Sequence, residues 1–306
     1  MSDKKTSCPE CGGPSSLLYK NVRSYYADKD YDIFKCAECS LCFTFPFGIE
    51  KSFYSEEGYG YQRRKLQNRE RKFRNKYYAS LISKYARNRV LEIGCQFGEL
   101  LAEIKSDFFV EGVELAKEPC LEVKNKGIHC FNGTIEGYAE VCQEQFDTVV
   151  SFHTIEHLTG LKSFFDSIKK VIAEDGTLIL AVPNFEESKR LKGNWGWTLV
   201  PAHQYHFTRS SINSALEKNG FEIREILYRG GDASFYLSSL YNILGLKGSK
   251  KVNLPASRPL ASPRGEQGGL ASRIAFSLFY LLISRVMFNR GKEEILVVAK
   301  RRDSHF

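Results

Sequence analysis

Residues 91–98 read LEIGCQFG, and this stretch decides the fold. The apolar run Val90–Ile93 predicts a short buried strand, and Gly98–Lys105 predicts the helix that follows it. Glycines at positions 94 and 98 let the backbone turn sharply between the two and approach a ligand closely. A strand, a glycine turn and a helix in this order are typical of an α/β protein.

Downstream of this stretch, short apolar runs alternate with amphipathic segments. Seven strands are expected, at 90–93, 109–114, 128–131, 146–152, 176–183, 221–228 and 294–300. Helices are expected at 98–105, 117–126, 161–173 and 208–219, the last with Thr208 as its N-cap. This alternation predicts a Rossmann-like, seven-stranded, mostly parallel sheet covered on both faces, and ligands of such sheets bind beyond the carboxyl ends of the strands.

Two acidic residues distinguish the glycine turn from a dinucleotide site. Glu92 directly precedes the turn, and Glu114 ends the second strand 22 residues later. A carboxylate at the entrance of the turn repels a pyrophosphate and favours a ligand that carries a positive charge. An acid at the end of the second strand can accept hydrogen bonds from both ribose hydroxyls.

Residues 89–229 resemble the class I S-adenosylmethionine (SAM)-dependent methyltransferases, whose first motif is an acid followed by glycines at alternate positions. Gln96 stands where the middle glycine is common. The resemblance implies SAM as cofactor, with Glu92 near its amino group, Glu114 on the ribose and Leu115 beside the adenine. The full set of cofactor-binding residues that it implies is Glu92, Gly94, Cys95, Gly98, Glu114, Leu115, Thr134, Ile135 and Phe152.

Three histidines are candidate bases for methyl transfer. His153 follows the fourth strand, which in the family faces the methyl group and the acceptor, and histidine titrates near the working pH. His203 and His206 belong to a Pro-x-His-x-Tyr-His-Phe stretch that resembles the acceptor pocket of small-molecule methyltransferases. Glu156 and His157 either orient the following helix or, by resemblance to the Glu-x-x-Glu-His segment of ubiquinone-pathway O-methyltransferases, help to bind a divalent ion.

Two C-x-x-C pairs occupy the N-terminal region, and a gap of 24 residues separates them. Four thiolates at this spacing predict a zinc ribbon with a closed, structural zinc site. The predicted ligands are Cys8, Cys11, Cys36 and Cys39. The remaining cysteines, at 42, 95, 120, 130 and 142, are expected to be small core residues.

The predicted domains are a zinc ribbon at 1–46, a helical linker or lid at 47–86, and a methyltransferase domain at 87–306 with an insertion at about 232–290. Residues 63–76 carry eight basic side chains and predict a helix over the cofactor site. The insertion combines lysines with the apolar stretch 274–283, which is too short to span a membrane and packs either on the protein or on a membrane surface.

The net charge of +8 favours anionic partners without identifying one. The start of the chain has no apolar stretch of the secretory kind, so the expected location is the cytoplasm, with peripheral membrane contact as an alternative. The favoured function is methylation of a small molecule, a sugar or sugar-linked metabolite hydroxyl, with a nucleotide- or lipid-linked sugar as partner. The alternatives are an RNA or protein methyltransferase and a non-catalytic SAM- and zinc-binding module.

Overall fold

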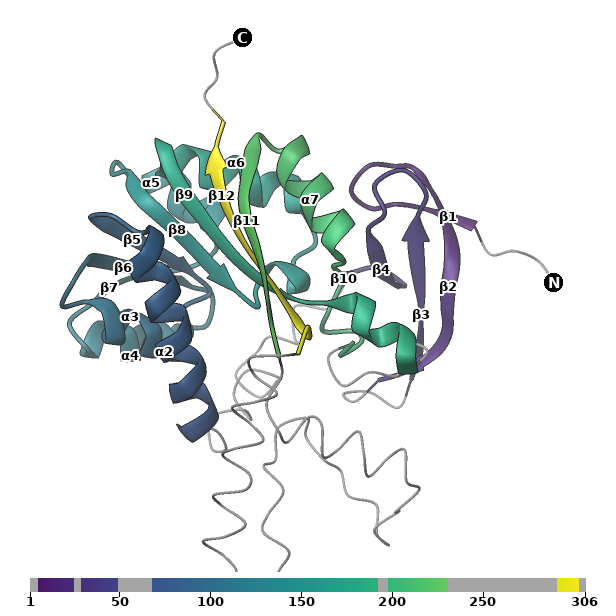
Figure 1. Cartoon of the computed structure of the whole chain (residues 1–306), viewed down its shortest axis with the longest axis horizontal. Helices are drawn as coiled ribbons and strands as arrows, with labels where there is room; N and C mark the ends of the chain where they lie inside the picture. Colours follow the sequence, from purple (N-terminus) through teal and green to yellow (C-terminus); the bar gives the residue numbers. More distant parts are fainter. Residues whose placement is uncertain (1–4, 25–28, 49–67, 192–197, 231–290, 303–306) are drawn as a thin grey trace, which may run out of the picture.

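The computed structural model describes residues 5–24, 29–48, 68–191, 198–230 and 291–302. Its elements form a large sheet with helices and a smaller sheet at the N-terminal end of the chain (Figure 1). The insertion at 232–290, the first five residues (63–67) of the basic segment 63–76, and both tryptophans (195 and 197) lie outside the described residues. Among the described helices, none is long and apolar enough to cross a membrane.

The large sheet confirms the seven-stranded prediction, with the order β11-β12-β9-β8-β5-β6-β7. Strands β5 to β9 are parallel, whereas β12 runs antiparallel to both of its neighbours. The strands are β5 (Arg89–Ile93), β6 (Phe109–Glu114), β7 (His129–Asn132), β8 (Phe146–Phe152), β9 (Ile172–Pro183), β11 (Phe221–Arg229) and β12 (Glu294–Arg301). The carboxyl ends of the parallel strands and the start of β12 therefore meet at one edge of the sheet.

Alternate strand residues pack against helices on the two faces of this sheet. Val90 and its same-side neighbours contact the cluster that includes α2 and α3, while Leu91 belongs to the cluster of α5, α6 and α7. The helices are α2 (Asn68–Tyr85), α3 (Glu99–Ile104), α4 (Lys117–Asn125), α5 (Ile135–Val141), α6 (Leu161–Val171) and α7 (Arg209–Lys218). The expected two-faced covering of the sheet is present.

In the large sheet and its helices, two elements differ from the sequence prediction. Helix α5 was not predicted, although Thr134 caps it by accepting a hydrogen bond from the backbone of Gly137. Strand β9 begins at Ile172 rather than at Gly176, because the residues before Thr177 are included in the strand as an irregularity in the pairing of β8 with β9.

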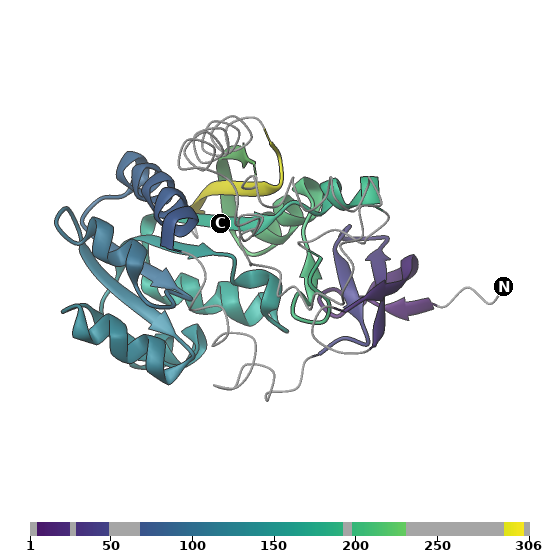
Figure 2. The ribbon, with the colours of Figure 1, turned by 90° about the horizontal axis from the view of Figure 1, so that it is seen from below.

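The N-terminal sheet has the order β1-β2-β3-β4-β10. Its strands β1 (Lys5–Ser7), β2 (Pro14–Arg23), β3 (Asp30–Cys36) and β4 (Cys42–Phe45) come from the predicted zinc ribbon. The fifth strand, β10 (Tyr205–His206), comes from residues assigned by sequence to the methyltransferase domain. Figures 1 and 2 both place the ribbon strands beyond one side of the large sheet, and one apolar cluster includes residues of both parts.

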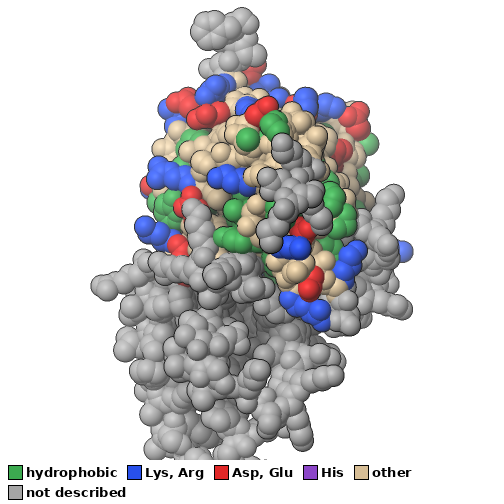
Figure 3. Space-filling view, turned by 90° about the vertical axis from the view of Figure 1, so that its right-hand side faces the viewer, with side chains coloured by type: hydrophobic (Ala, Val, Ile, Leu, Met, Phe, Trp, Pro, Cys, Tyr) green, Lys and Arg blue, Asp and Glu red, His purple; other side chains and the backbone are tan. Residues whose placement is uncertain are grey.

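The surface charge is mixed on the face that carries the ribbon. Figure 3 shows Lys and Arg side chains interspersed with Asp and Glu over the described residues of that face. Several basic side chains elsewhere are also paired with acids, for example Lys170 with Glu140 and Arg87 with Asp175. The described part of this face therefore presents no continuous basic patch of the kind that binds a phosphate backbone.

Candidate functional site

The glycine turn after β5 has the backbone conformation that its sequence predicts. Gly94 has a φ of +76° and Gly98 a φ of +66°, in the left-handed region that favours glycine. A Cβ atom on Gly94 would lie 2.3 Å from the Thr154 Oγ1 atom, so a side chain does not fit there. Gln96, which replaces the middle glycine, adopts a φ of +48° and its side chain is exposed. The turn therefore retains a glycine-like backbone at the non-glycine position.

Glu92 lies under this turn with only 6% of its surface exposed. Its Oε2 atom is buried and has no hydrogen-bond partner in the described part of the chain. Burial, together with the nearby carboxylates of Glu99 and Glu114, raises the pKa of Glu92 well above its usual range. A cationic donor would stabilise the ionised form of this buried carboxyl and satisfy its unpaired oxygen. The ammonium group of SAM is such a donor.

Glu114 connects the turn to the end of β6. One carboxylate oxygen accepts a hydrogen bond from the backbone of Gln96 and the other from Ala116, each at 2.9 Å. Burial raises the pKa of Glu114, while these backbone N–H groups oppose the rise. Each oxygen keeps a second lone pair, so the carboxylate fits the predicted contact with ribose hydroxyls.

The other predicted cofactor residues lie around the same edge of the sheet. Leu115 is 58% exposed directly after Glu114, whereas the Cys95 and Ile135 side chains point into the core and leave only backbone for a ligand. Thr134 is exposed at the N-terminus of α5. Phe152, at the end of β8, stacks on Tyr78 of α2 with 4.1 Å between the ring centroids.

His153 follows β8 and is held between two carboxylates. Its Nε2 atom lies 2.9 Å from Oε1 of Glu294 and its Nδ1 atom 3.5 Å from Oε1 of Glu156. Both carboxylate side chains are 1% exposed, whereas the His153 side chain is 16% exposed. Of these three groups, the imidazole is therefore the one that a ligand reaches most easily.

The backbone and the charge of His153 are both unusual. Its φ of +53° is rare for a residue with a side chain, and such strain is concentrated at functional sites. Burial lowers the pKa of His153, but the carboxylates of Glu294 and Glu156 outweigh burial and raise the pKa above 6.5. A proton taken up by this imidazole is therefore stabilised by two neighbouring negative charges.

Sequence reasoning missed the residues that support His153 from behind. Glu294, at the start of β12, accepts hydrogen bonds from the Tyr78 hydroxyl and from the Nε atom of Arg229. Burial raises the pKa of Glu294, but Arg229 and His153 more than reverse this and lower it to about 2. In the sequence, Arg229 and Glu294 are each a charged residue next to an apolar strand. This pattern does not indicate that the two side chains pair.

His203 and His206 do not share a helix, and they have different surroundings. His206 is 3% exposed, its Nε2 atom lies 2.9 Å from the Thr44 hydroxyl, and burial lowers its pKa to about 3. These contacts give His206 a packing role, so we do not include it in the proton transfer proposed below. His203 packs edge-on against His157, with 4.7 Å between the ring centroids.

Glu156, His157 and His203 form a group whose donor atoms all lie within 4.8 Å of one another. Glu156 and His157 belong to a short 3₁₀ helix, η3 (Ile155–His157), and the Nδ1 atom of His157 lies 2.9 Å from the carbonyl oxygen of Ala202. Two imidazoles and one carboxylate suit zinc or another transition metal better than magnesium. Of the described residues near His153, the group that could hold a metal thus includes His203 and not His153.

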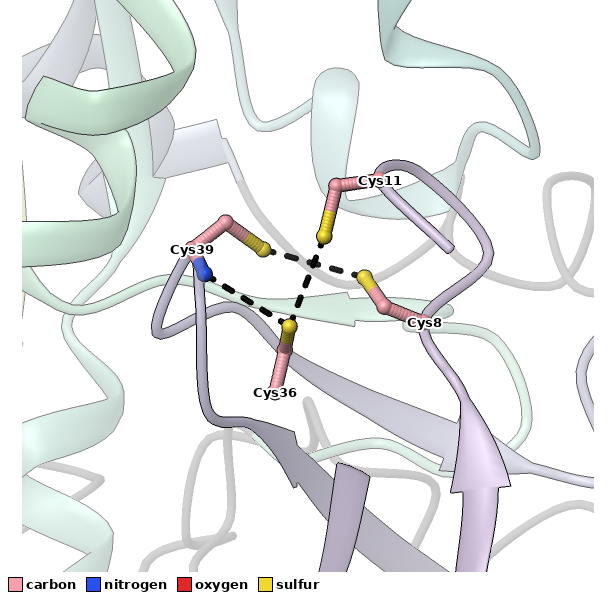
Figure 4. A group of neighbouring side chains, drawn as sticks. All are labelled: Cys8, Cys11, Cys36 and Cys39. Atoms are coloured by element: carbon pink, nitrogen blue, oxygen red, sulfur yellow. Dashed lines mark hydrogen bonds between the residues drawn. The ribbon is translucent and has the colours of Figure 1, made fainter. Parts of the chain in front are cut away.

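The four predicted zinc ligands converge between the two knuckles (Figure 4). The Sγ atoms of Cys8 and Cys39 are 3.7 Å apart, and those of Cys11 and Cys36 are 3.5 Å apart. Zinc–sulfur bonds of about 2.3 Å in a tetrahedron separate the sulfurs by about 3.8 Å, so the cluster fits a zinc ion. Cys42, Cys95, Cys120 and Cys130 are buried as expected, and Cys142 is partly buried.

Comparison with known proteins agrees with this geometry. A family model described as a methyltransferase domain matches residues 65–226, just over half of the 306 residues. The mitochondrial ubiquinone biosynthesis O-methyltransferase of Dictyostelium discoideum is 24% identical over 163 residues, which are 45% of this chain and 50% of that protein. The chain thus spans about half the length of this curated relative.

Solved structures with a similar arrangement include a SAM-dependent methyltransferase from Archaeoglobus fulgidus, with a TM-score of 0.47 and 18% identity over 76% of this chain and 97% of that one. The N-methyltransferase NodS from Bradyrhizobium japonicum, in complex with S-adenosyl-L-homocysteine, has a TM-score of 0.45 and 13% identity over 77% and 89% of the two chains. On the extent of the family match, the chain belongs to the methyltransferase-domain family.

Proposed function

We propose that this chain transfers a methyl group from SAM to a hydroxyl group of a small-molecule acceptor, a sugar or sugar-linked metabolite. The observation that carries the proposal is the position of His153, a partly exposed imidazole at the end of β8 between two buried carboxylates. A hydroxyl must lose its proton as its oxygen attacks a methyl group, and this residue can take that proton.

The residues of the chain divide the work at the edge of the sheet. SAM, when bound, supplies a methyl group activated by the sulfonium next to it. Glu92 would accept a hydrogen bond from the ammonium group and Glu114 from the ribose hydroxyls, so these two residues would hold the cofactor at this edge of the sheet. His153 takes the proton from the hydroxyl group that is methylated. Glu294 and Glu156 stabilise the imidazolium that results.

Nδ1 of His153 is the nitrogen that we assign to this proton transfer. The Nε2 atom faces the Glu294 carboxylate at 2.9 Å and the Tyr78 hydroxyl at 3.2 Å, so that side of the ring is anchored. The contact of Nδ1 with Glu156 is longer, at 3.5 Å, and an acceptor hydroxyl can displace it. Glu294 thus orients the ring, as the carboxylate does in a nucleophile–histidine–acid triad.

Oxygen as the acceptor atom is supported by the name of the Dictyostelium relative, which is an O-methyltransferase. The sugar assignment rests on the ribbon, which is followed by Phe43-Thr44-Phe45-Pro46 and resembles the ribbons that precede methyltransferase domains acting on sugars and other small metabolites. The 201–207 stretch resembles the acceptor pocket of small-molecule methyltransferases in general. An RNA acceptor is not favoured by the mixed charges on the ribbon face (Figure 3). We also propose that Cys8, Cys11, Cys36 and Cys39 hold a structural zinc ion.

The direct test measures S-adenosyl-L-homocysteine release from SAM with three acceptor classes: nucleotide sugars, catechol-type phenols and RNA. We expect turnover with a nucleotide sugar, and its loss in His153→Asn, while the exposed histidine variant His129→Asn keeps wild-type activity. Turnover with RNA alone, or full activity of His153→Asn, would contradict the proposal. Metal analysis of the purified chain should find one zinc per chain, and a metal-free protein would contradict the zinc assignment.

A further inference from the structure

Glu10 lies inside the first cysteine knuckle, between Cys8 and Cys11, and its side chain reaches out of the ribbon. One carboxylate oxygen accepts a hydrogen bond from the hydroxyl of Tyr205 in β10. Both oxygens lie 3.2 Å from the backbone nitrogen of Leu161, the first residue of α6. A single carboxylate thus joins the metal knuckle to two elements that sequence assigns to the methyltransferase domain.

The segment 198–207 is held by the ribbon at further points. Tyr205 and His206 pair antiparallel with Phe43 and Cys42 of β4. The Thr44 hydroxyl donates to the carbonyl oxygen of His203 at 2.7 Å, and Ser24 donates to the carbonyl oxygen of Val200 at 2.8 Å. The ribbon is therefore the scaffold against which this segment is ordered.

The same segment supports the site on its other side. The backbone nitrogen of Gln204 donates to the carbonyl oxygen of Glu156 at 2.8 Å, and the Ala202 carbonyl contacts the ring of His157. Glu156 is in turn one of the two carboxylates beside His153. A short chain of contacts thus runs from the knuckle through Tyr205 and its neighbour Gln204 to the acceptor side of the site.

We propose that Glu10 is a positioning residue that couples zinc loading of the ribbon to the order of the acceptor-side segment 198–207. The coupling rests on the proposed zinc site. The knuckle joins the paired strands β1 and β2, and its own backbone bonds run from Cys8 to Gly13 and from Gly12 to Cys8. When its thiolates lose their metal, the knuckle no longer holds the Glu10 carboxylate against Tyr205 and the start of α6.

The cofactor side of the site does not depend on this connection. Glu92 and Glu114 are positioned by β5, β6 and the glycine turn, whose hydrogen bonds run within the large sheet. Loss of the Glu10 contact should therefore disturb the acceptor side and leave SAM binding intact. This separation distinguishes a positioning role from a general loss of stability.

Hydrogen exchange on the full-length, zinc-loaded chain tests the proposal, with Glu10→Gln as the main variant. The matched control is Glu38→Gln, because Glu38 occupies the same place in the second knuckle and is exposed. We expect Glu10→Gln to keep its zinc and its SAM affinity, and to exchange at least about tenfold faster over 198–207 and at the start of α6. Peptides over 90–98 should exchange as in the wild type, and Glu38→Gln should change none of these regions.

A second variant and a chelation experiment complete the test. Tyr205→Phe removes the same hydrogen bond from the other side. It should therefore also speed hydrogen exchange over 198–207, and it leaves the sequence of the knuckle unchanged. Chelation of zinc from the wild type should raise exchange over 198–207 while 90–98 stays protected. Unchanged exchange over 198–207 in both zinc-loaded variants would overturn the role of Glu10, whereas a wild type without zinc would overturn the zinc site and the coupling together.

Discussion

Replacing Glu156 with glutamine should lower the pKa of His153. The Glu156 carboxylate is 3.5 Å from Nδ1 of His153 and 1% exposed, so water screens the interaction poorly. An opposite charge at this range shifts a pKa by about 1 to 3 units. We expect the low end, about 1 unit or ~1.4 kcal/mol, because Glu294 remains in place at 2.9 Å on the other nitrogen.

Histidine-selective NMR provides the assay, since the chain has six histidines and His153→Asn identifies the resonance. In the wild type, His153 should titrate above 6.5, as its raised pKa requires. Its contribution to stability should be complete below the unfolded-state pKa near 6.5 and be lost as the pH rises through the raised value. Glu140→Gln, which removes an exposed acid on α5, is the control and should leave this titration unchanged.

Two results would refute this reasoning about His153. A wild-type pKa at or below 6.5 would mean that burial outweighs both carboxylates. An unchanged pKa in Glu156→Gln would mean that Glu156 does not stabilise the imidazolium and that Glu294 acts alone.

Three other substitutions test separate parts of the structure. Gly94→Ala should abolish measurable SAM binding in calorimetry, because the new methyl group would lie 2.3 Å from Thr154 Oγ1 at a left-handed φ. Cys36→Ser should reduce zinc content and lower the melting temperature in calorimetric scans. An unchanged melting temperature would mean that the ribbon does not stabilise the rest of the protein. Arg229→Met should cost about 3 kcal/mol in urea unfolding, because it removes the buried guanidinium that is paired with the Glu294 carboxylate.

The strands of the large sheet could be predicted because each is a short apolar run that ends at a turn signal. The Leu91–Gly98 stretch predicted its strand, turn and helix within one or two residues. Helix α5 was not predicted because it is only seven residues long and buries two side chains, Ile135 and Tyr138. A helix this short carries too little periodicity to stand out from its surroundings.

The contacts that build the acceptor side could not be predicted from sequence. Strand β10 has two residues and pairs with β4, about 160 positions away, so no local pattern marks it. The environment of His153 likewise depends on Glu294 and Arg229 from the last two strands, which meet only in the folded sheet. Residue type alone indicated the candidate histidines. The side chains around them in the fold distinguish His153, as a candidate base, from the buried His206.

Calorimetric titration with SAM tests the location of the cofactor site most directly, using wild type, Glu92→Gln and Glu99→Gln. We expect saturable binding of one SAM per chain, and a loss of about 1.5–3 kcal/mol, or roughly 10- to 150-fold, in Glu92→Gln. The control Glu99→Gln, which removes an exposed carboxylate from the first residue of α3, should bind nearly as the wild type does. Absence of saturable binding to the wild type at high micromolar SAM, or unchanged affinity in Glu92→Gln, would contradict the site described above.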